Sequence, residues 1–390
     1  MRRPQYFVSV TALCLALAGT ALAQTWNEIT PASGPMPTPR WVPSAVFDTA
    51  ERRMIIFGGE TAGNARLNDV WAFDLDTHTW EDLTPASPPA EPALRRTPMS
   101  VYDPVGHRMI TWSGQGTGGA FFADAWSFDL TTNEWTEIMP SGGPPAIRYG
   151  AAGVYDPVGG DLVTFAGFTF QGRFEDVWRL NAAADTWTDV SEPAVDSPLK
   201  RCLHSASYDA YNHRLIMYGG QNSGALDDIW AFDLDTEEWT ELTPVTSPPG
   251  RWFAAHVYDS ANHRSTIYGG NMNGTRSDDV LIFDLWTNTW GALAPSGTPP
   301  SAREGAKAIY DGTHDRMVVF GGYDGSHLNE VWELTGLSDT PSAVSPSPAA
   351  AALAQNVPNP FNPTTTITFE LAAPARVALR IFDVRGRRVR

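Results

Sequence analysis

The chain has 390 residues, of which 42% are hydrophobic and 18% charged, and its formal net charge is −17. Residues 24–336 carry 19 Lys and Arg against 41 Asp and Glu, a net charge of −22 for that segment. Such an acidic surface repels phosphate backbones and argues against nucleic acid as a partner. The only two cysteines, Cys14 and Cys202, are too few for a disulfide framework or a thiolate metal site.

The first 23 residues have the pattern of a secretory leader. Arg2 and Arg3 precede the apolar run VTALCLALAG, and Ala21-Leu22-Ala23 has the small-x-small form of a cleavage site. The apolar run is shorter than the roughly 20 residues that a membrane-spanning helix needs. We therefore expect residues 1–23 to be a signal peptide, and the mature protein to be secreted or held at the outer cell surface without spanning a membrane.

A repeat with a period near 52 residues dominates the chain. The first unit begins at Arg40, and seven residues later comes the aromatic–acid pair Phe47-Asp48. The apolar runs MIIFGG (54–59), NDVWAFDL (68–75) and TWEDLTP (79–85) then follow. Six units start in this way, at Arg40, Arg95, Arg148, Arg201, Arg251 and Arg303.

Each unit predicts four short antiparallel strands, because its runs are rich in β-branched and aromatic residues and are separated by turn residues. One such sheet cannot bury both faces alone, whereas sheets stacked around an axis can. The glycine pair, the aromatic in the third run and the Trp in the fourth resemble kelch repeats. This resemblance covers residues 25–336 and implies an all-β, six-bladed propeller domain over residues 24–336. The pattern departs from kelch repeats at Ser113, Ala166 and Leu281.

The heptapeptide TWNEITP (25–31) matches the fourth run of a unit, yet it precedes the first unit. The sixth unit has three runs and then no fourth Trp strand. We therefore expect the strand containing Trp26 to complete the sixth blade. Such a strand closes the ring and removes its exposed sheet edges.

Two further segments follow the propeller. Residues 337–355 are rich in Ala, Ser and Pro and predict a linker. Residues 356–390 contain PNPFNP, followed by the alternating runs TTTITFEL and RVALRIFDV. This segment resembles the first half of the C-terminal sorting domain of bacterial proteins secreted by the type IX pathway. The resemblance implies an incomplete Ig-like β-sandwich and the secretion machinery as a partner.

Repeat symmetry suggests which residues bind a ligand, since a residue that breaks the repeat is freer to serve one. The residue after each repeated Arg varies, and the loops between the second and third runs add aromatics. In kelch propellers these loops share the ligand-binding face, so the resemblance places both sets there. The repeated arginines favour a structural role, although a ring of guanidinium groups could also hold an anion. The candidate ligand-binding residues are Trp41, Arg96, Tyr149, Arg201, Trp252, Arg303, Glu304, Phe122, Phe168 and Tyr323.

The residues favour a binding module for an extracellular protein or a glycan, with no assigned catalytic residue, metal or cofactor. A Cys202–His204 nucleophile lacks a third, orienting group, and His204 with His256 is a weak metal signal. Sugar-acid epimerases built from six kelch blades keep a carbohydrate-active enzyme open by analogy, with Glu304 and arginine as working groups. A structural spacer whose variable residues merely cap the channel is the third alternative.

Overall fold

The computed structural model describes residues 24–191, 197–339, 352–353 and 369–370, and the chain separates into two compact units, residues 1–340 and 341–390. In the second unit, the described residues form one antiparallel pair, β27 (Ala352–Leu353) with β28 (Phe369–Glu370). The predicted signal peptide and most of the predicted linker and sorting domain lie outside the described residues. Within the described ranges, no helix is long and apolar enough to cross a bilayer.

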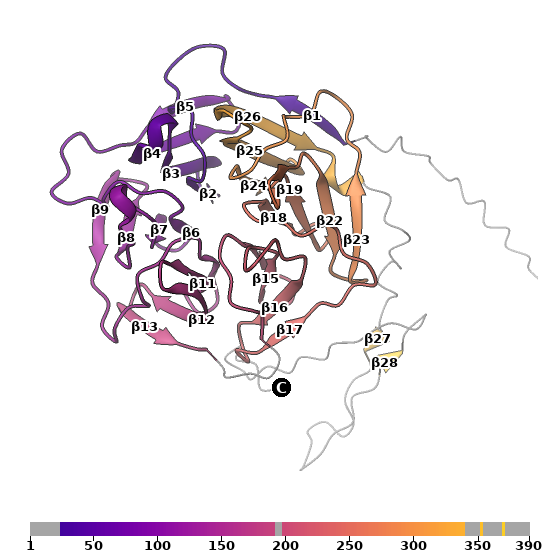
Figure 1. Cartoon of the computed structure of the whole chain (residues 1–390). Coiled ribbons are helices and arrows are strands. Elements are labelled where there is room, and N and C mark those ends of the chain that lie inside the picture. The colour runs from indigo at the N-terminus through magenta and orange to yellow at the C-terminus, as the bar shows by residue number, and fades with distance from the viewer. Residues whose placement is uncertain (1–23, 192–196, 340–351, 354–368, 371–390) are drawn as a thin grey trace, which may run out of the picture. The chain divides into compact units, whose positions relative to one another are not determined.

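The first unit is a ring of six four-stranded antiparallel sheets, which confirms the all-β, six-bladed propeller (Figure 1). The first strand of each blade lies nearest the axis and the fourth lies at the rim. The strands of blade 1 are β2 (Ser44–Asp48), β3 (Arg53–Glu60), β4 (Arg66–Asp74) and β5 (Thr79–Asp82). Those of blade 2 are β6 (Met99–Asp103), β7 (Arg108–Trp112), β8 (Ala125–Asp129) and β9 (Glu134–Ile138). Those of blade 3 are β10 (Ala152–Asp156), β11 (Asp161–Thr169), β12 (Gly172–Asn181) and β13 (Thr186–Asp189).

The second half of the ring repeats this order. Blade 4 has β14 (Ser205–Asp209), β15 (Arg214–Tyr218), β16 (Ile229–Asp233) and β17 (Trp239–Glu241). Blade 5 has β18 (Ala255–Asp259), β19 (Arg264–Tyr268), β22 (Val280–Asp284) and β23 (Thr289–Leu293), with the small hairpin β20 (Asn271–Met272) and β21 (Thr275–Arg276) in its loop. Blade 6 has β24 (Lys307–Asp311), β25 (Arg316–Tyr323), β26 (His327–Thr335) and β1 (Thr25–Glu28). The helical turns in the described ranges are η1 (Ala62–Asn64), η2 (Thr117–Gly119) and η3 (Leu337–Asp339).

The N-terminal strand completes blade 6, as the repeat count predicts. β1 pairs antiparallel with β26, with Thr25 opposite Thr335 and Glu28 opposite Trp332. Leu337, which the sequence analysis places in the linker, is 2% exposed and packs in the same core cluster as Trp26. The propeller packing therefore extends past residue 336.

Buried aromatic contacts explain why every blade needs a Trp in its fourth strand. Trp26 is 3% exposed, and its ring packs 5.2 Å from that of Tyr268 at the end of the second strand of blade 5. Each fourth-strand Trp packs in the same way on the aromatic residue that precedes the glycine-pair position of the preceding blade. The other pairs are Trp80–Phe320, Trp135–Phe57, Trp187–Trp112, Trp239–Phe165 and Trp290–Tyr218. The tryptophans are thus the apolar links between blades.

Candidate functional site

The six repeated arginines hold each blade together from within. In blade 1, Arg40 forms a two-point ion pair with Asp69 at 2.6 and 2.7 Å and donates to the Gly58 carbonyl at 3.0 Å. Asp69 also accepts a hydrogen bond from the indole of Trp71. The planar guanidinium suits such a fork of bonds, which a lysine could not reproduce. The equivalent pairs are Arg95–Asp124, Arg148–Asp176, Arg201–Asp228, Arg251–Asp279 and Arg303–Glu330.

The glycine pair connects neighbouring blades through the same arginines. The N–H of Gly59 donates to the Arg95 carbonyl of blade 2 at 2.9 Å. Gly58 has φ of +65°, and a Cβ there would lie 2.8 Å from that carbonyl oxygen. Ser113 and Ala166 keep the same left-handed backbone, at φ of +64° and +59°, so these departures from the repeat preserve the turn.

These contacts correct the prediction that Arg201 and Arg303 contribute to a ligand site. Their side chains are 0% and 1% exposed, and both guanidinium groups are bonded to an acid and a backbone carbonyl of their own blade. They do not present a free cation to a ligand. The third departure from the repeat is Leu281, which stands where the other blades have a Trp. Blade 5 therefore lacks the indole that would donate to its acid, Asp279, and Arg251 bonds to Asp279 through a single contact of 3.2 Å.

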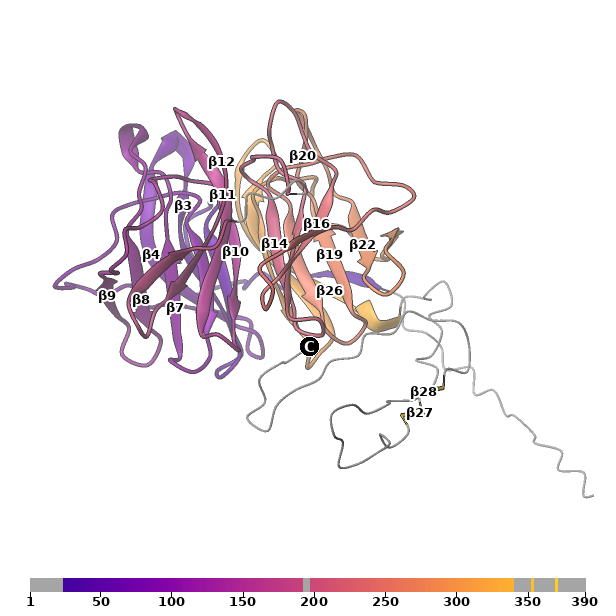
Figure 2. The ribbon, with the colours of Figure 1, turned by 90° about the horizontal axis from the view of Figure 1, so that it is seen from below.

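Twelve residues of variable type are joined in pairs by backbone bridges at the end of the ring that carries the loop with β20 (Figure 2). Six follow the repeated arginines, and six follow the glycine pairs. For example, Trp41 and Glu60 exchange two N–H···O bonds of 3.0 Å. We call this set the mouth ring. Its pairs are Trp41–Glu60, Arg96–Gln115, Tyr149–Phe168, Cys202–Gln221, Trp252–Asn271 and Glu304–Tyr323.

Arg96 is the centre of one half of the mouth ring. Its guanidinium donates to Glu60 at 2.9 Å and to the Gln115 side chain at 2.6 and 2.9 Å. It also lies over two aromatic rings, 5.9 Å from the centroid of Trp41 and 5.7 Å from that of Tyr149. These cation–π contacts bring three of the predicted residues together.

Glu304 is the centre of the other half. It is 7% exposed and accepts bonds from the Asn271 amide at 2.9 Å and from Arg276 at 3.1 Å. Arg276 lies 4.6 Å from the ring centroid of Tyr323, and Tyr323 packs 5.7 Å from Trp41. Both halves therefore meet at Trp41. Trp252 joins through its backbone bridge to Asn271.

Aromatic residues of the loops extend the site over blades 2 and 3. Phe121 stacks on Tyr149 at 5.7 Å and contacts Phe168 and Phe170. Phe170 is 75% exposed, which is unusual for a large apolar side chain. Phe122 is different, because its ring lies 4.3 Å from the buried Arg95 guanidinium and so covers that ion pair.

Sequence reasoning missed four of the six mouth-ring residues that follow the glycine pairs. Glu60, Gln115 and Asn271 contact predicted residues, and Gln221 bridges to Cys202, yet none of these four is among the predicted residues. The signal was present, since the residue after each glycine pair varies from blade to blade just as the residue after each arginine does. Applying the symmetry criterion to both positions identifies the full set.

The buried Cys202 is poorly suited to nucleophilic chemistry. Its side chain is 1% exposed, and burial raises the pKa of the thiol. Burial also lowers the pKa of His204 to about 3, with the Arg201 charge adding to the effect. A thiol that stays protonated beside an imidazole that stays neutral is the reverse of an activated pair. In the described ranges, no group of three or more His, Cys, Asp or Glu is arranged to hold a metal ion.

The opposite face carries a second ring of contacts between blades, built on the aspartates that end the first strands. Asp156 accepts bonds from two N–H groups of its own turn and from His213 of blade 4 at 2.8 Å. Burial would raise the pKa of Asp156, but the His213 bond and the turn bonds outweigh it and lower the pKa to about 2. The bond to Asp156 raises the pKa of His213. Histidines of these turns therefore serve the framework.

The repeats, the arginine–glycine links and the rim tryptophans define a kelch-repeat propeller. The chain matches the KLHDC2/KLHL20/DRC7 Kelch-repeats domain over residues 17–195 and 190–350, and it belongs to this family. It is 29% identical over 311 residues to acyl-CoA-binding domain-containing protein 4 of Arabidopsis thaliana, covering 77% of this chain and 45% of that protein. It is 26% identical over 327 residues to multiple epidermal growth factor-like domains protein 8 of Mus musculus, covering 81% of this chain and 10% of that protein. The chain thus spans less than half the length of these curated relatives.

Proposed function

We propose that the chain is a protein-binding module that docks its partner on the mouth ring and the adjoining loop aromatics. One observation carries the proposal: the residues after the repeated arginines and those after the glycine pairs vary between blades and lie together on one face. The residues after the arginines include the aromatics Trp41, Tyr149 and Trp252, as well as Arg96 and Glu304. Aromatic residues and arginine dominate the energetic centres of protein interfaces. The kelch-propeller fold supports the same role.

Charge favours a partner segment that carries carboxylates. Four arginines lie at or beside the mouth ring: Arg66, Arg96, Arg173 and Arg276. Glu60 and Glu304 pair with three of them, whereas Arg173 bonds to the neutral Gln221 side chain. With Asp324, which directly follows Tyr323, four arginines face three acids here, in contrast to the net charge of −22 over residues 24–336. An acidic, aromatic-rich segment would meet complementary charge here and be repelled elsewhere.

The test compares matched exposed residues on the two faces. Phe170→Ser and Arg173→Glu change the mouth face, while Val158→Ser changes an apolar residue of the same 75% exposure in the β10–β11 turn. Tagged wild-type and variant chains would be used to capture proteins from the envelope and medium of the producing organism. We expect a partner that is retained by Val158→Ser and lost, by at least tenfold, with the two mouth variants. A partner retained equally by all chains would contradict the proposed surface.

Other outcomes would redirect the assignment. A signal on a glycan array that Trp41→Ala abolishes would make the ligand a sugar. Turnover of a sugar acid that Glu304→Gln abolishes while binding remains would make the chain a carbohydrate-active enzyme. A triple change of Trp41, Trp252 and Glu304 that alters only stability would favour a structural spacer.

We also propose that the propeller acts outside the cell, on the basis of the leader pattern at residues 1–23 and of the sorting-domain resemblance at residues 356–390. Secretion would place the mouth ring in contact with extracellular partners. N-terminal sequencing of protein recovered from the medium or cell surface tests this, with a start at Gln24 expected. Recovery of the full-length chain from the cytoplasm alone would contradict it.

A further inference from the structure

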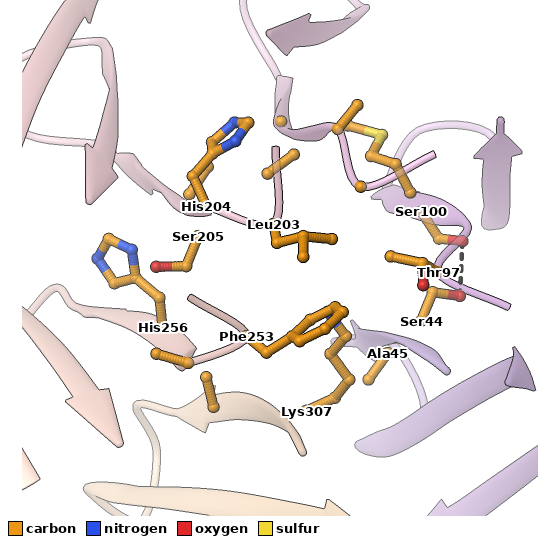
Figure 3. A pocket seen from close by; sticks show the side chains of 18 of the residues that line it. Ser44, Ala45, Thr97, Ser100, Leu203, His204, Ser205, Phe253, His256 and Lys307 are labelled. Atoms are coloured by element: carbon orange, nitrogen blue, oxygen red, sulfur yellow. Dashed lines mark hydrogen bonds between the residues drawn. The ribbon is translucent and has the colours of Figure 1, made fainter. Parts of the chain in front are cut away.

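A cavity of about 130 Å³ lies on the propeller axis, lined by residues of the first strands and of the turns just before them (Figure 3). A cavity of this size has room for several waters or for one ion of a few heavy atoms. In this view Thr97, Ser44 and Ser100 lie on one side, and His204, Ser205 and His256 lie on the other. Its lining includes no residue of the mouth ring, although the lining residue Phe253 packs 5.4 Å from the ring of Trp41.

The lining is rich in proton donors and holds no carboxylate. It includes the ammonium of Lys307, two imidazoles and four hydroxyl groups, and none of its residues is Asp or Glu. In the described ranges, Lys307 forms no ion pair within 4.0 Å. Burial lowers the pKa of Lys307 to about 8, so the side chain still carries its charge at neutral pH. A cation held in a cavity without a counter-ion costs free energy.

Several of the lining groups also lack a partner within the protein. Thr97 is 6% exposed and His204 is 7% exposed; the Thr97 hydroxyl and both His204 ring nitrogens form no hydrogen bond to another protein group, and nor does the Ser205 hydroxyl. Buried polar groups in native proteins are nearly always satisfied, so unpaired ones that line a common space suggest a missing ligand. A neutral imidazole still offers one N–H donor.

The repeat shows that Lys307 is a substitution specific to blade 6. The residue four positions after each repeated arginine is Ser44, Met99, Ala152, Ser205 or Ala255 in the other blades. Lys307 is also one of only two lysines in the chain. In the seam between blades 1 and 2, the hydroxyls of Ser44 and Ser100 bond at 2.7 Å. The same register places Lys307 beside Ala45, a small residue that also lines the cavity and leaves space at that position.

We propose that the axial cavity binds one small oxyanion of the phosphate or sulfate class, with Lys307 as its counter-ion and Thr97 as a hydroxyl donor. Such an ion has four oxygen acceptors, which suit a lining whose side chains offer ammonium, hydroxyl and imidazole donors and no carboxylate. Its binding would neutralise the charge of Lys307. The proposal does not depend on the protein-binding role of the mouth ring.

The test is equilibrium dialysis of the full chain against radiolabelled inorganic phosphate, with chloride holding the ionic strength constant. We expect one phosphate per wild-type chain, at least tenfold weaker binding for Lys307→Met, and unchanged binding for Lys200→Met, which removes the other, exposed lysine. Thermal unfolding gives a second readout, because a ligand that binds only the folded state raises the Tm with its concentration. Phosphate also stabilises proteins non-specifically, so the comparison between the two lysine variants is essential.

Thr97→Val keeps the shape of the side chain and removes only the hydroxyl, so it should weaken phosphate binding even if Lys307→Met folds poorly. Equal binding by wild type, Lys307→Met and Thr97→Val would overturn the proposal. So would wild-type binding that does not exceed that of a denatured sample. Competition by sulfate, with no competition by chloride, is expected.

Discussion

The substitution Trp26→Ala tests how the ring is closed. Trp26 is 3% exposed and packs on Tyr268, while β1 is held by its pairing to β26 and by the bond from the Trp26 N–H to the Ser296 carbonyl at 3.0 Å. Removing a buried Trp side chain costs about 3–5 kcal/mol. Because β1 is only four residues long, we expect this loss to release the strand before the other blades unfold.

Trp135→Ala in blade 2 is the matched control. Trp135 is 5% exposed and packs on Phe57 at 4.9 Å, so the substitution removes a contact of nearly the same kind. Its strand, β9, is covalently continuous with the third strand of its own blade and with the next blade. We therefore expect a similar loss of global stability for both variants, but local opening only for Trp26→Ala.

Hydrogen exchange with mass spectrometry distinguishes the two cases. In Trp26→Ala, the amides of β26 should lose protection selectively, since their partners in β1 have left, while β8 and β12 keep theirs. In Trp135→Ala, β26 should exchange as in the wild type. Unchanged protection of β26 in Trp26→Ala, or equal loss in all six blades, would refute the idea that β1 is a separable closing strand.

Three further predictions concern the framework. The Asp156–His213 pair should stabilise the fold by about 1 kcal/mol. This contribution is full just below the ordinary His pKa near 6.5, falls as pH rises through the raised pKa of His213, and is also lost as pH falls towards the Asp156 pKa of about 2. The free energy of unfolding of His213→Asn, measured with denaturant, should therefore change less than that of the wild type between pH 6 and 9. Arg201→Met should cost about 3–5 kcal/mol and Arg251→Met about half as much in the same assay, because the Arg251 pair has a single contact with a half-exposed acid. Cys202 should resist alkylation in the native protein and react on unfolding, and rapid native labelling would contradict its 1% exposure.

The sequence was sufficient to predict the fold because the repeated residues form the links between strands and blades. The rim Trp, the glycine position and the initial Arg each recur in register, and each makes an equivalent contact in every blade, with a single acid contact for Arg251. The missing fourth strand of the last unit and the extra one before Arg40 then left one way to complete the ring. Even the departures at Ser113 and Ala166 were harmless, since both residues adopt the required left-handed backbone.

The site was predicted less completely, because side-chain identity alone does not say which variable residues are neighbours. Phe122 and Phe168 look alike in sequence, but Phe122 covers a buried ion pair while Phe168 lies in the mouth ring. Lys307 breaks the repeat as clearly as Glu304 does, yet the sequence around it has the apolar pattern of a buried first strand. Only the register of neighbouring first strands places it on the axis.

The closing strand and the mouth ring are linked through the seam between blades 6 and 1. Trp41 belongs to blade 1 and Tyr323 to blade 6, and their rings pack at 5.7 Å across this seam. Trp26 itself packs between blades 5 and 6, while Ile29, which directly follows β1, is buried between blades 6 and 1. Glu304 belongs to blade 6, and its partner Arg276 lies in β21, in the loop of blade 5. If the mouth ring is the docking surface, Trp26→Ala should weaken partner capture more than Trp135→Ala at equal global stability. Equal capture by the two variants would mean that the mouth keeps its geometry when the ring is open.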